Sequence, residues 1–168
     1  MHKKIAIVAV DSNWAIGKDN QLLYNIPVDM NFFKITTSGN IVVYGLNTLN
    51  SFPKQKPLSN RTNIVLSPQT IEKENLITAH SIKEVDEILE TINDDRDVFI
   101  CGGASVYKQM INSCDEALIT HIYTTTENAD TFFPNLTEMD NWKEKDCLLE
   151  TIDGNYKIKI IRYINLNK

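Results

Sequence analysis

The sequence predicts an α/β domain built on a mainly parallel sheet that ends in an antiparallel edge. Short apolar segments without polar alternation, such as 4–10 and 97–101, indicate strands that are covered on both faces. Most of these segments alternate along the chain with helical segments, as parallel strands require. The last two predicted strands instead face each other across Asp153-Gly154, a strong hairpin-turn signal. A ligand is therefore expected at the carboxyl ends of the parallel strands.

Length and composition point to a single domain, residues 1–168, of ordinary globular type. A chain of 168 residues can bury a sizeable core, and 42% hydrophobic with 23% charged residues is typical of a soluble protein. The net charge of −5 argues against nucleic acid or an anionic membrane as the main partner. The apolar run near the N-terminus stops at Asp11, too early for a signal peptide, and no later run could span a bilayer.

The cysteines and histidines suggest neither a metal site nor a disulfide framework. Three cysteines are an odd number, and they lie far apart in the sequence. The three histidines are scattered and lack the spacing of a metal site. The sequence therefore predicts no metal, and it favours a reducing, cytoplasmic location.

Apolar runs, turn residues and helix caps predict these elements in chain order: a strand over 4–10, a long loop over 11–24, a helix over 29–37, a strand over 41–44, a short helix over 47–51, a loop over 53–60, strands over 61–66 and 76–79, a helix over 81–92, a strand over 97–101, a helix over 105–111, a strand over 116–123, an extended piece over 130–133, and a hairpin over 148–152 and 156–164. Pro27 suits the first helical position, where its missing N–H costs nothing. Asn47 is the expected N-cap of the short helix, and Ser81 with Glu84 forms a capping box. The 11–24 loop is long for a compact domain, and such loops are more often functional than idle.

Asp29 is the most informative single residue. It falls in the first turn of its helix, near the positive end of the helix dipole. Met30, Phe33 and, one turn on, Thr37 lie on the adjoining face, whereas Phe32 is expected to turn elsewhere. A carboxylate among apolar neighbours has to be hydrogen-bonded or protonated. A plain helix-capping aspartate is an equally good interpretation at this point.

Three other places could carry chemistry. Gly102-Gly103 joins a buried strand to a helix, which allows either close approach of a ligand or merely a tight turn. Thr120 is a hydroxyl inside a buried strand, satisfied either by the backbone or by a partner such as Asp29. Arg61 begins a strand, where it is either solvated or ready to clamp a carboxylate. Phosphate-loop and dinucleotide fingerprints, catalytic triads and paired carboxylates are absent from the sequence.

Taken together, these segments resemble the dihydrofolate reductase family along nearly the whole chain. The matching segments are IAIVAVD (5–11), AIGKDNQLL (15–23), NIPVDMNFFK (25–34), VVYG (42–45), RTNIVLS (61–67), CGGASVYKQ (101–109), LITHI (118–122) and ADTFFP (129–134). Their joint order and spacing carry the resemblance, since no segment alone is decisive. The resemblance implies the fold of that family and the reduction of 7,8-dihydrofolate to tetrahydrofolate with NADPH.

The resemblance implies that Asp29 is the carboxylate of the pterin site. It would hydrogen-bond the pterin and favour protonation at N5, by way of water, while hydride passes from the nicotinamide to C6. A raised pKa would suit this role. Thr120 matches the threonine that supports the carboxylate, and Tyr24 stands where the family usually has a tryptophan that helps hold an ordered water. The other matching substrate positions are Ile5, Ala6, Met30, Phe33, Phe52, Leu58, Cys101 and Arg61, the last matching the arginine that grips the glutamate α-carboxylate of folate.

A second set of matching positions implies the NADPH site. In the family the bond between Gly102 and Gly103 is cis, so a cis peptide is expected here. The loop over 11–24 matches the mobile lid over the nicotinamide, which excludes water. The matching cofactor positions are Ile7, Ile16, Gly17, Gly45, Leu46, Asn47, Thr48, Leu66, Ser67, Cys101, Gly102, Gly103, Ala104, Ser105, Val106 and Tyr107.

One departure bears on the choice of cofactor. After Gly45 the family commonly carries a basic pair that grips the cofactor phosphates, but here the pair is Leu46-Asn47. Ser67 remains as a donor to the 2′-phosphate, and one hydroxyl is a weak substitute for an arginine. The preference for NADPH over NADH is therefore expected to be reduced, unless a lysine or His80 supplies the charge.

Two alternatives and a set of partners complete the expectation. A pteridine or riboflavin-pathway reductase of the same fold lacks the Pro-x-Asp-x-x-x-Phe helix start and the matching arginine. A non-catalytic folate-binding homologue is the other alternative, and the intact set of Asp29, Arg61 and Thr120 argues against it. The expected partners are dihydrofolate and antifolate-type small molecules, with no nucleic acid and no membrane, and the expected state is a monomer.

Overall fold

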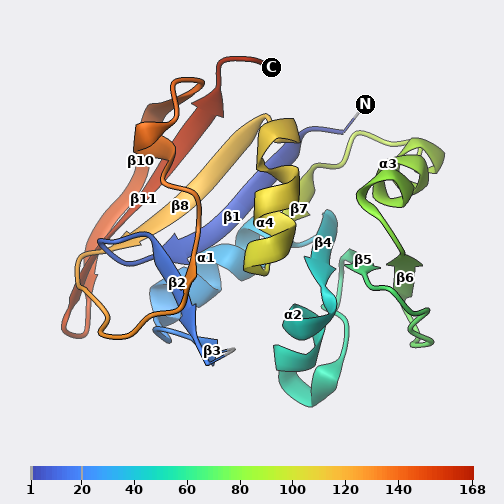
Figure 1. The fold of residues 1–168 in the computed structure, drawn as a ribbon, viewed down its shortest axis with the longest axis horizontal. Coiled ribbons are helices and arrows are strands. Elements are labelled where there is room, and N and C mark those ends of the chain that lie inside the picture. The colour runs from blue at the N-terminus through green and yellow to red at the C-terminus, as the bar shows by residue number, and fades with distance from the viewer. Residues whose placement is uncertain (1, 20) are drawn as a thin grey trace.

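The structure is a computed structural model that describes residues 2–19 and 21–168. Its large sheet is made of β1 (Lys4–Val10), β4 (Ile41–Gly45), β5 (Thr62–Leu66), β6 (Leu76–Ala79), β7 (Val98–Ile100), β8 (Glu116–Ile122), β10 (Trp142–Asp153) and β11 (Tyr156–Asn165). The order across the sheet is β10-β11-β8-β1-β7-β4-β5-β6 (Figure 1). The strands from β8 to β6 pair in parallel, whereas β11 pairs antiparallel with both β8 and β10. The predicted parallel sheet with an antiparallel C-terminal edge is confirmed.

Helices cover both faces of this sheet. They are α1 (Pro27–Thr37), α2 (Leu46–Ser51), α3 (Ile82–Thr91) and α4 (Ala104–Met110), with 3-10 turns η1 (Pro53–Gln55), η2 (Ile111–Ser113) and η3 (Leu136–Glu138). Successive residues of a strand point to opposite faces. Ala6 of β1 accordingly joins the core that contains Val106 of α4, while Ile5 joins the core against which Phe33 of α1 packs. The two cores fix α1 and α4 on opposite sides of β1.

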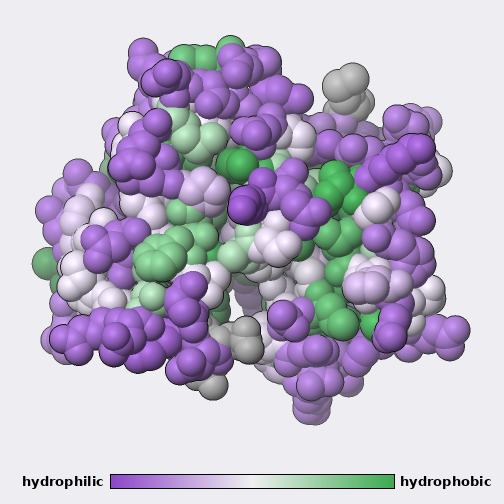
Figure 2. Space-filling view, viewed as in Figure 1, coloured by the Kyte–Doolittle hydropathy of each residue, from purple (hydrophilic) through white to green (hydrophobic). Residues whose placement is uncertain are grey.

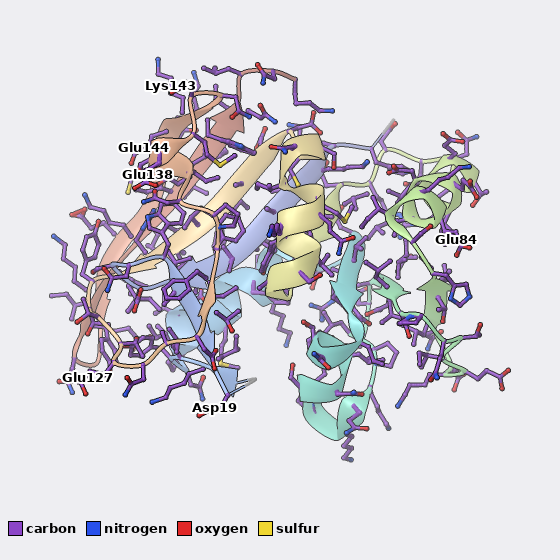
Figure 3. The ribbon with its side chains drawn as sticks, in the orientation of Figure 1. Asp19, Glu84, Glu127, Glu138, Lys143 and Glu144 are labelled. Atoms are coloured by element: carbon purple, nitrogen blue, oxygen red, sulfur yellow. The ribbon has the colours of Figure 1, made fainter. Side chains whose placement is uncertain are left out.

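The 11–24 segment is not a plain loop, so that part of the prediction is wrong. It carries β2 (Ala15–Lys18) and β3 (Gln21–Leu22), and β2 also pairs with β9 (Thr131–Phe132). The backbone of Asp130 donates to Gly17 O at 3.2 Å, and the carboxylate of Asp130 accepts from the backbone of Asp19 at 3.0 Å. Asp19 is labelled at the lower end of this small sheet in Figure 3. The partner strand lies far away in sequence, which explains why local pattern missed the pairing.

Two predictions about the helices are also corrected. The N-cap of α2 is Gly45 rather than Asn47, because the chain leaves its extended conformation at Gly45 and Leu46 is already helical. Phe32 does not turn away from the core, since it packs against the same cluster as Phe33. Met30 is instead the exposed member of this turn, with 59% of its surface accessible. The first helical residue is Pro27, as expected.

The remaining differences concern ends of elements. The strand before the hairpin begins at Trp142 instead of residue 148, because pairing with β11 extends through a charged segment that has little strand pattern of its own. The hydroxyl of Ser81 caps α3 as predicted, but the carboxylate of Glu84 accepts from the backbone of His80 and not from that of Ser81. Within the described residues, no helix is long and apolar enough to cross a membrane.

Candidate active site

The site is centred on Asp29 and Thr120, which come from opposite parts of the chain. Asp29 lies in the first turn of α1, and the hydroxyl of Thr120 on β8 donates to its Oδ1 at 2.6 Å. Burial raises the pKa of the Asp29 carboxyl, and the hydrogen bond from Thr120 acts in the opposite direction. From the sequence, the Thr120 hydroxyl could bond either the backbone or a partner such as Asp29. In the structure it donates to the Asp29 carboxylate.

The paired glycines bring the carboxyl ends of β4 and β7 together. The peptide bond between Gly102 and Gly103 is cis, as expected. The carbonyl oxygen of Gly102 accepts from the backbone N–H of Gly45 at 2.9 Å. Gly102 has φ +115°, and a Cβ added there would lie 3.3 Å from the hydroxyl of Tyr107. A side chain would therefore be strained at this position, and the bare backbone leaves room for close approach of a ligand.

Tyr107 ties α4 to the central strand β1. Its buried hydroxyl donates to the carbonyl oxygen of Ile7 at 2.7 Å. Burial raises the pKa of this phenol well above its usual range, so the hydroxyl stays protonated and remains a donor. One hydrogen bond thus joins Ile7 and Tyr107, two of the expected cofactor positions.

Arg61 is oriented by contacts on one side of its guanidinium. Nε donates to Ser59 O at 2.9 Å, and Nη1 donates to the hydroxyl of Thr37 at 3.0 Å. Thr37 is fixed in turn, because its hydroxyl donates to Phe33 O in α1. Among the residues that the structure describes, Nη2 makes no hydrogen bond. Burial lowers the pKa of Arg61, but a guanidinium keeps its charge. The sequence did not indicate Thr37 as its anchor.

Tyr24 makes its hydrogen bonds away from Asp29. Its hydroxyl lies 2.8 Å from Oγ1 of Thr126 and 3.3 Å from Thr125 O, and its ring meets the edge of Tyr156. These contacts tie the end of the 11–24 segment to the chain that follows β8. The catalytic role assigned to Tyr24 stays a prediction.

Most other substrate-side positions gather around the core on the α1 side of the sheet, whereas Ala6 faces the core on the α4 side. Ile5 and Ala6 are buried in β1, and the partly buried positions on the α1 side are Phe33, Phe52, Leu58 and Cys101. Figure 2 shows the surface hollowed between the segment that carries β2 and β3 and helix α2. The thiol of Cys101 lies 3.5 Å from Phe99 O, and burial raises its pKa strongly. This thiol is therefore protonated and a poor nucleophile.

Most of the cofactor-side positions lie along the carboxyl ends of β4, β5 and β7. Leu46, Asn47 and Thr48 begin α2. Ser67 follows β5 and is buried, with its hydroxyl accepting from the backbone of Gln69 at 3.2 Å. The ring of His80 adjoins this turn, because its Nδ1 lies 3.0 Å from Ser67 O. The other positions are placed as follows: Ile16 and Gly17 on β2, Leu66 at the end of β5, and Ala104, Ser105 and Val106 in the first turn of α4.

Comparisons with known proteins identify the family. A family model described as dihydrofolate reductase matches residues 4–164. The dihydrofolate reductase of Haemophilus influenzae is 37% identical over 138 residues, which are 82% of this chain and 80% of the relative. That of Bacillus subtilis is 36% identical over 138 residues, covering 82% and 78%.

A solved structure agrees with these relatives. The dihydrofolate reductase of Enterococcus faecalis, complexed with NADP(H) and RAB-propyl, superposes with a TM-score of 0.82 at 31% identity, covering 97% of this chain and 96% of that one. The chain therefore belongs to the dihydrofolate reductase family. It has dihydrofolate reductase activity, and the family's fold is confirmed.

Proposed function

We propose that Asp29 binds the pterin of 7,8-dihydrofolate and promotes protonation at N5. The observation that carries this proposal is the short contact between Thr120 and Oδ1 of Asp29, which leaves Oδ2 and a second lone pair of Oδ1 for the ring N–H and amino group of the pterin. Burial raises the pKa of this carboxyl, so it can help supply a proton nearer neutrality than an exposed aspartate could. NADPH, when bound, supplies the hydride that C6 receives.

The residues at the carboxyl edge of the sheet suit that cofactor. Gly45, Gly102 and Gly103 offer bare backbone where the ends of β4 and β7 meet, and Gly102 has little room for a side chain. Thr48 and Ser105 add hydroxyls in the first turns of α2 and α4. The segment that carries β2 and β3 would exclude water from the nicotinamide. A relative's structure complexed with NADP(H) supports this placement.

The proposed role of Arg61 is to grip the α-carboxylate of the substrate's glutamate. Thr37 and Ser59 hold one side of its guanidinium, which leaves other N–H groups for a carboxylate. The apolar side chains of Phe33, Phe52 and Leu58 would enclose the aminobenzoyl ring between Arg61 and Asp29.

We propose further that the protein works as a monomer in the cytoplasm, where its three free thiols would stay reduced.

The test of the proposed role of Asp29 is Asp29→Asn. The variant should lose at least about a hundredfold in turnover at pH 7, because the amide cannot take part in proton supply. Turnover is followed by the absorbance change of NADPH oxidation with dihydrofolate, and folding by circular dichroism. Asp140→Asn, which removes an exposed carboxylate, is the matched control. Wild-type turnover in Asp29→Asn would contradict the proposal.

A weakened preference for NADPH over NADH is also part of the proposal. The first turn of α2 holds Leu46 and Asn47, which carry no charge, and the ring of His80 adjoins the Ser67 turn. Leu46→Arg should raise the ratio of kcat/KM for NADPH to that for NADH about tenfold, through a charged hydrogen bond to the 2′-phosphate. Leu46→Met, of similar size and uncharged, is the control. An unchanged ratio would mean that another residue recognises the 2′-phosphate.

A further inference from the structure

The N-terminus of α1 is capped by a residue from the opposite end of the chain. Ile26, at the N-cap position, provides no side-chain cap, and Pro27 has no N–H. The first available N–H, that of Val28, donates to Oδ2 of Asp153 at 3.0 Å. Asp153 is the last residue of β10, directly before Gly154 of the hairpin turn. Figure 1 shows this turn next to the start of α1.

The hairpin that carries Asp153 also supports Thr120. Asp153 lies opposite Tyr156 at the closed end of the hairpin. Four residues further along β11, Ile160 is paired with Thr120 of β8. The two side chains that contact the start of α1, the hydroxyl of Thr120 and the carboxylate of Asp153, are thus carried by β8 and β10, which are both hydrogen-bonded to β11. Their separation is fixed by the sheet.

Apolar contacts hold the approach to α1 against the same hairpin. Ile26 is buried in a cluster with Ile122 of β8 and Ile158 of β11. Tyr24 meets Tyr156 edge to face, with 5.1 Å between the ring centroids. These contacts bring the segment before α1 to the sheet, but they are not directional. The hydrogen bond from Val28 to Asp153 supplies the direction, because it fixes the rotation of the first helical turn.

We propose that Asp153 is a positioning residue that holds the first turn of α1 so that the Asp29 carboxylate meets Thr120. Val28 and Asp29 are neighbours in the chain, so any movement of the Val28 N–H moves the Asp29 carboxylate relative to Thr120. The negative carboxylate of Asp153 also complements the positive end of the helix dipole. This inference rests on the catalytic role proposed above for Asp29.

The experiment compares Asp153→Ala with Asp153→Asn by single-turnover hydride transfer across a range of pH. In Asp153→Ala, the limiting rate at low pH should fall about fivefold, because catalytic groups tolerate little displacement. The midpoint of the pH profile should move to higher pH, in the same direction as in Thr120→Val, because the Thr120 hydrogen bond lowers the pKa of Asp29. The KM for NADPH should not change. Asp153→Asn keeps a carbonyl oxygen that accepts from Val28, so it should retain the wild-type limiting rate and midpoint.

Glu150→Ala is the matched control, since Glu150 lies in the same strand and pairs with Lys159 at 3.2 Å, within the hairpin. It should keep the wild-type rate and midpoint. A lower melting temperature in Asp153→Ala, with rate and midpoint unchanged, would reduce Asp153 to a structural residue and overturn the proposal. Equal losses in Asp153→Ala and Asp153→Asn would overturn it as well. Failure of the role of Asp29 is distinguishable, because Asp29→Asn itself would then keep the wild-type rate and profile.

Discussion

Asp29 combines two opposing influences in one carboxyl group. Burial raises its pKa, whereas the hydroxyl of Thr120 stabilises the ionised form at 2.6 Å. From sequence alone, a helix-capping role was equally good. In the structure, the first free N–H of α1 donates to the carboxylate of Asp153 instead. Asp29 is therefore not required as the cap. Its carboxylate is available for a ligand.

This distribution of roles predicts the effect of Asp29→Asn on stability. Because burial disfavours the ionised carboxyl, the variant should be as stable as the wild type at pH 7 or gain up to about 1 kcal/mol in the free energy of unfolding. The folded-state pKa is raised, so the ionised group costs stability above its unfolded pKa, and the advantage of the variant should vanish near pH 3. Urea unfolding at both pH values measures the difference.

A decrease in the free energy of unfolding of Asp29→Asn would instead support the interpretation of Asp29 as a helix cap. If the charge of Asp29 mainly interacted with the helix dipole, Asp29→Asn would lose about 0.3–1 kcal/mol at pH 7. Thr120→Val separates the two influences further, since it removes the donor and leaves the burial unchanged. The stability measurement is independent of the turnover assay, so loss of activity cannot be mistaken for loss of fold.

At the scale of elements, the segment 11–24 is held by the chain that follows β8. The backbone of Ser12 donates to Thr124 O, and β2 pairs with β9. The hydroxyl of Tyr24 adds a side-chain contact to Thr126 at the other end of the segment. Trp14, Ala15 and Ile16 are buried and anchor the first half of the segment in the core, whereas Asp19 and Leu22 are exposed. Local opening, as expected of a lid, therefore belongs to the part of the segment beyond Gly17.

Tyr24→Phe should loosen this segment without changing its packing on Tyr156. The variant loses the hydrogen bonds of the hydroxyl and keeps the aromatic contact. Loss of about 1 kcal/mol from the closed form would speed NADPH dissociation about fivefold, measured by stopped-flow fluorescence. Tyr156→Phe, which removes the hydroxyl of the ring that contacts Tyr24, is the control. A slower single-turnover hydride transfer with unchanged dissociation would instead favour the catalytic role predicted for Tyr24.

At the scale of the whole molecule, His121 links β8 to the C-terminal hairpin. Its Nε2 lies 2.7 Å from the hydroxyl of Tyr163, and its ring meets the edge of Trp14. Burial, together with the nearby charge of Lys159, lowers the pKa of His121 to about 4. The folded protein therefore holds a neutral imidazole at a position that interrupts an apolar strand.

His121 should make the protein acid-sensitive. An unfolded histidine titrates near pH 6.5, so the unfolded chain binds its proton before the folded protein does. The contribution of His121 is then complete above about pH 6.5 and is lost as the pH falls toward about 4. After allowance for solvent screening, the free energy of unfolding should fall by about 1–2 kcal/mol more in the wild type than in His121→Gln between pH 7 and pH 4.5. Identical pH dependence in the two proteins would contradict this assignment.

The sequence by itself determined the sheet and the kinds of residue at the site. Apolar runs marked the central strands, and Asp153-Gly154 marked the hairpin, because these signals are local. The residue types of Asp29, Arg61 and Gly102 indicated a carboxylate, a guanidinium and a bare-backbone turn. The local sequence pattern did not predict elements that depend on a distant partner strand. Examples are the pairing of β2 with β9 and the early start of β10.

Only the tertiary structure decided which groups meet. It brought Thr120 to hydrogen-bonding distance of Asp29, and Thr37 to hydrogen-bonding distance of Arg61. It likewise brought the carboxylate of Asp153 to the first turn of α1. It also directed the hydroxyl of Tyr24 to Thr126. Each of these hydrogen bonds joins residues that are far apart in the chain, and its geometry depends on sheet register and helix packing. No local propensity encodes that geometry, because it arises only when the whole sheet has formed.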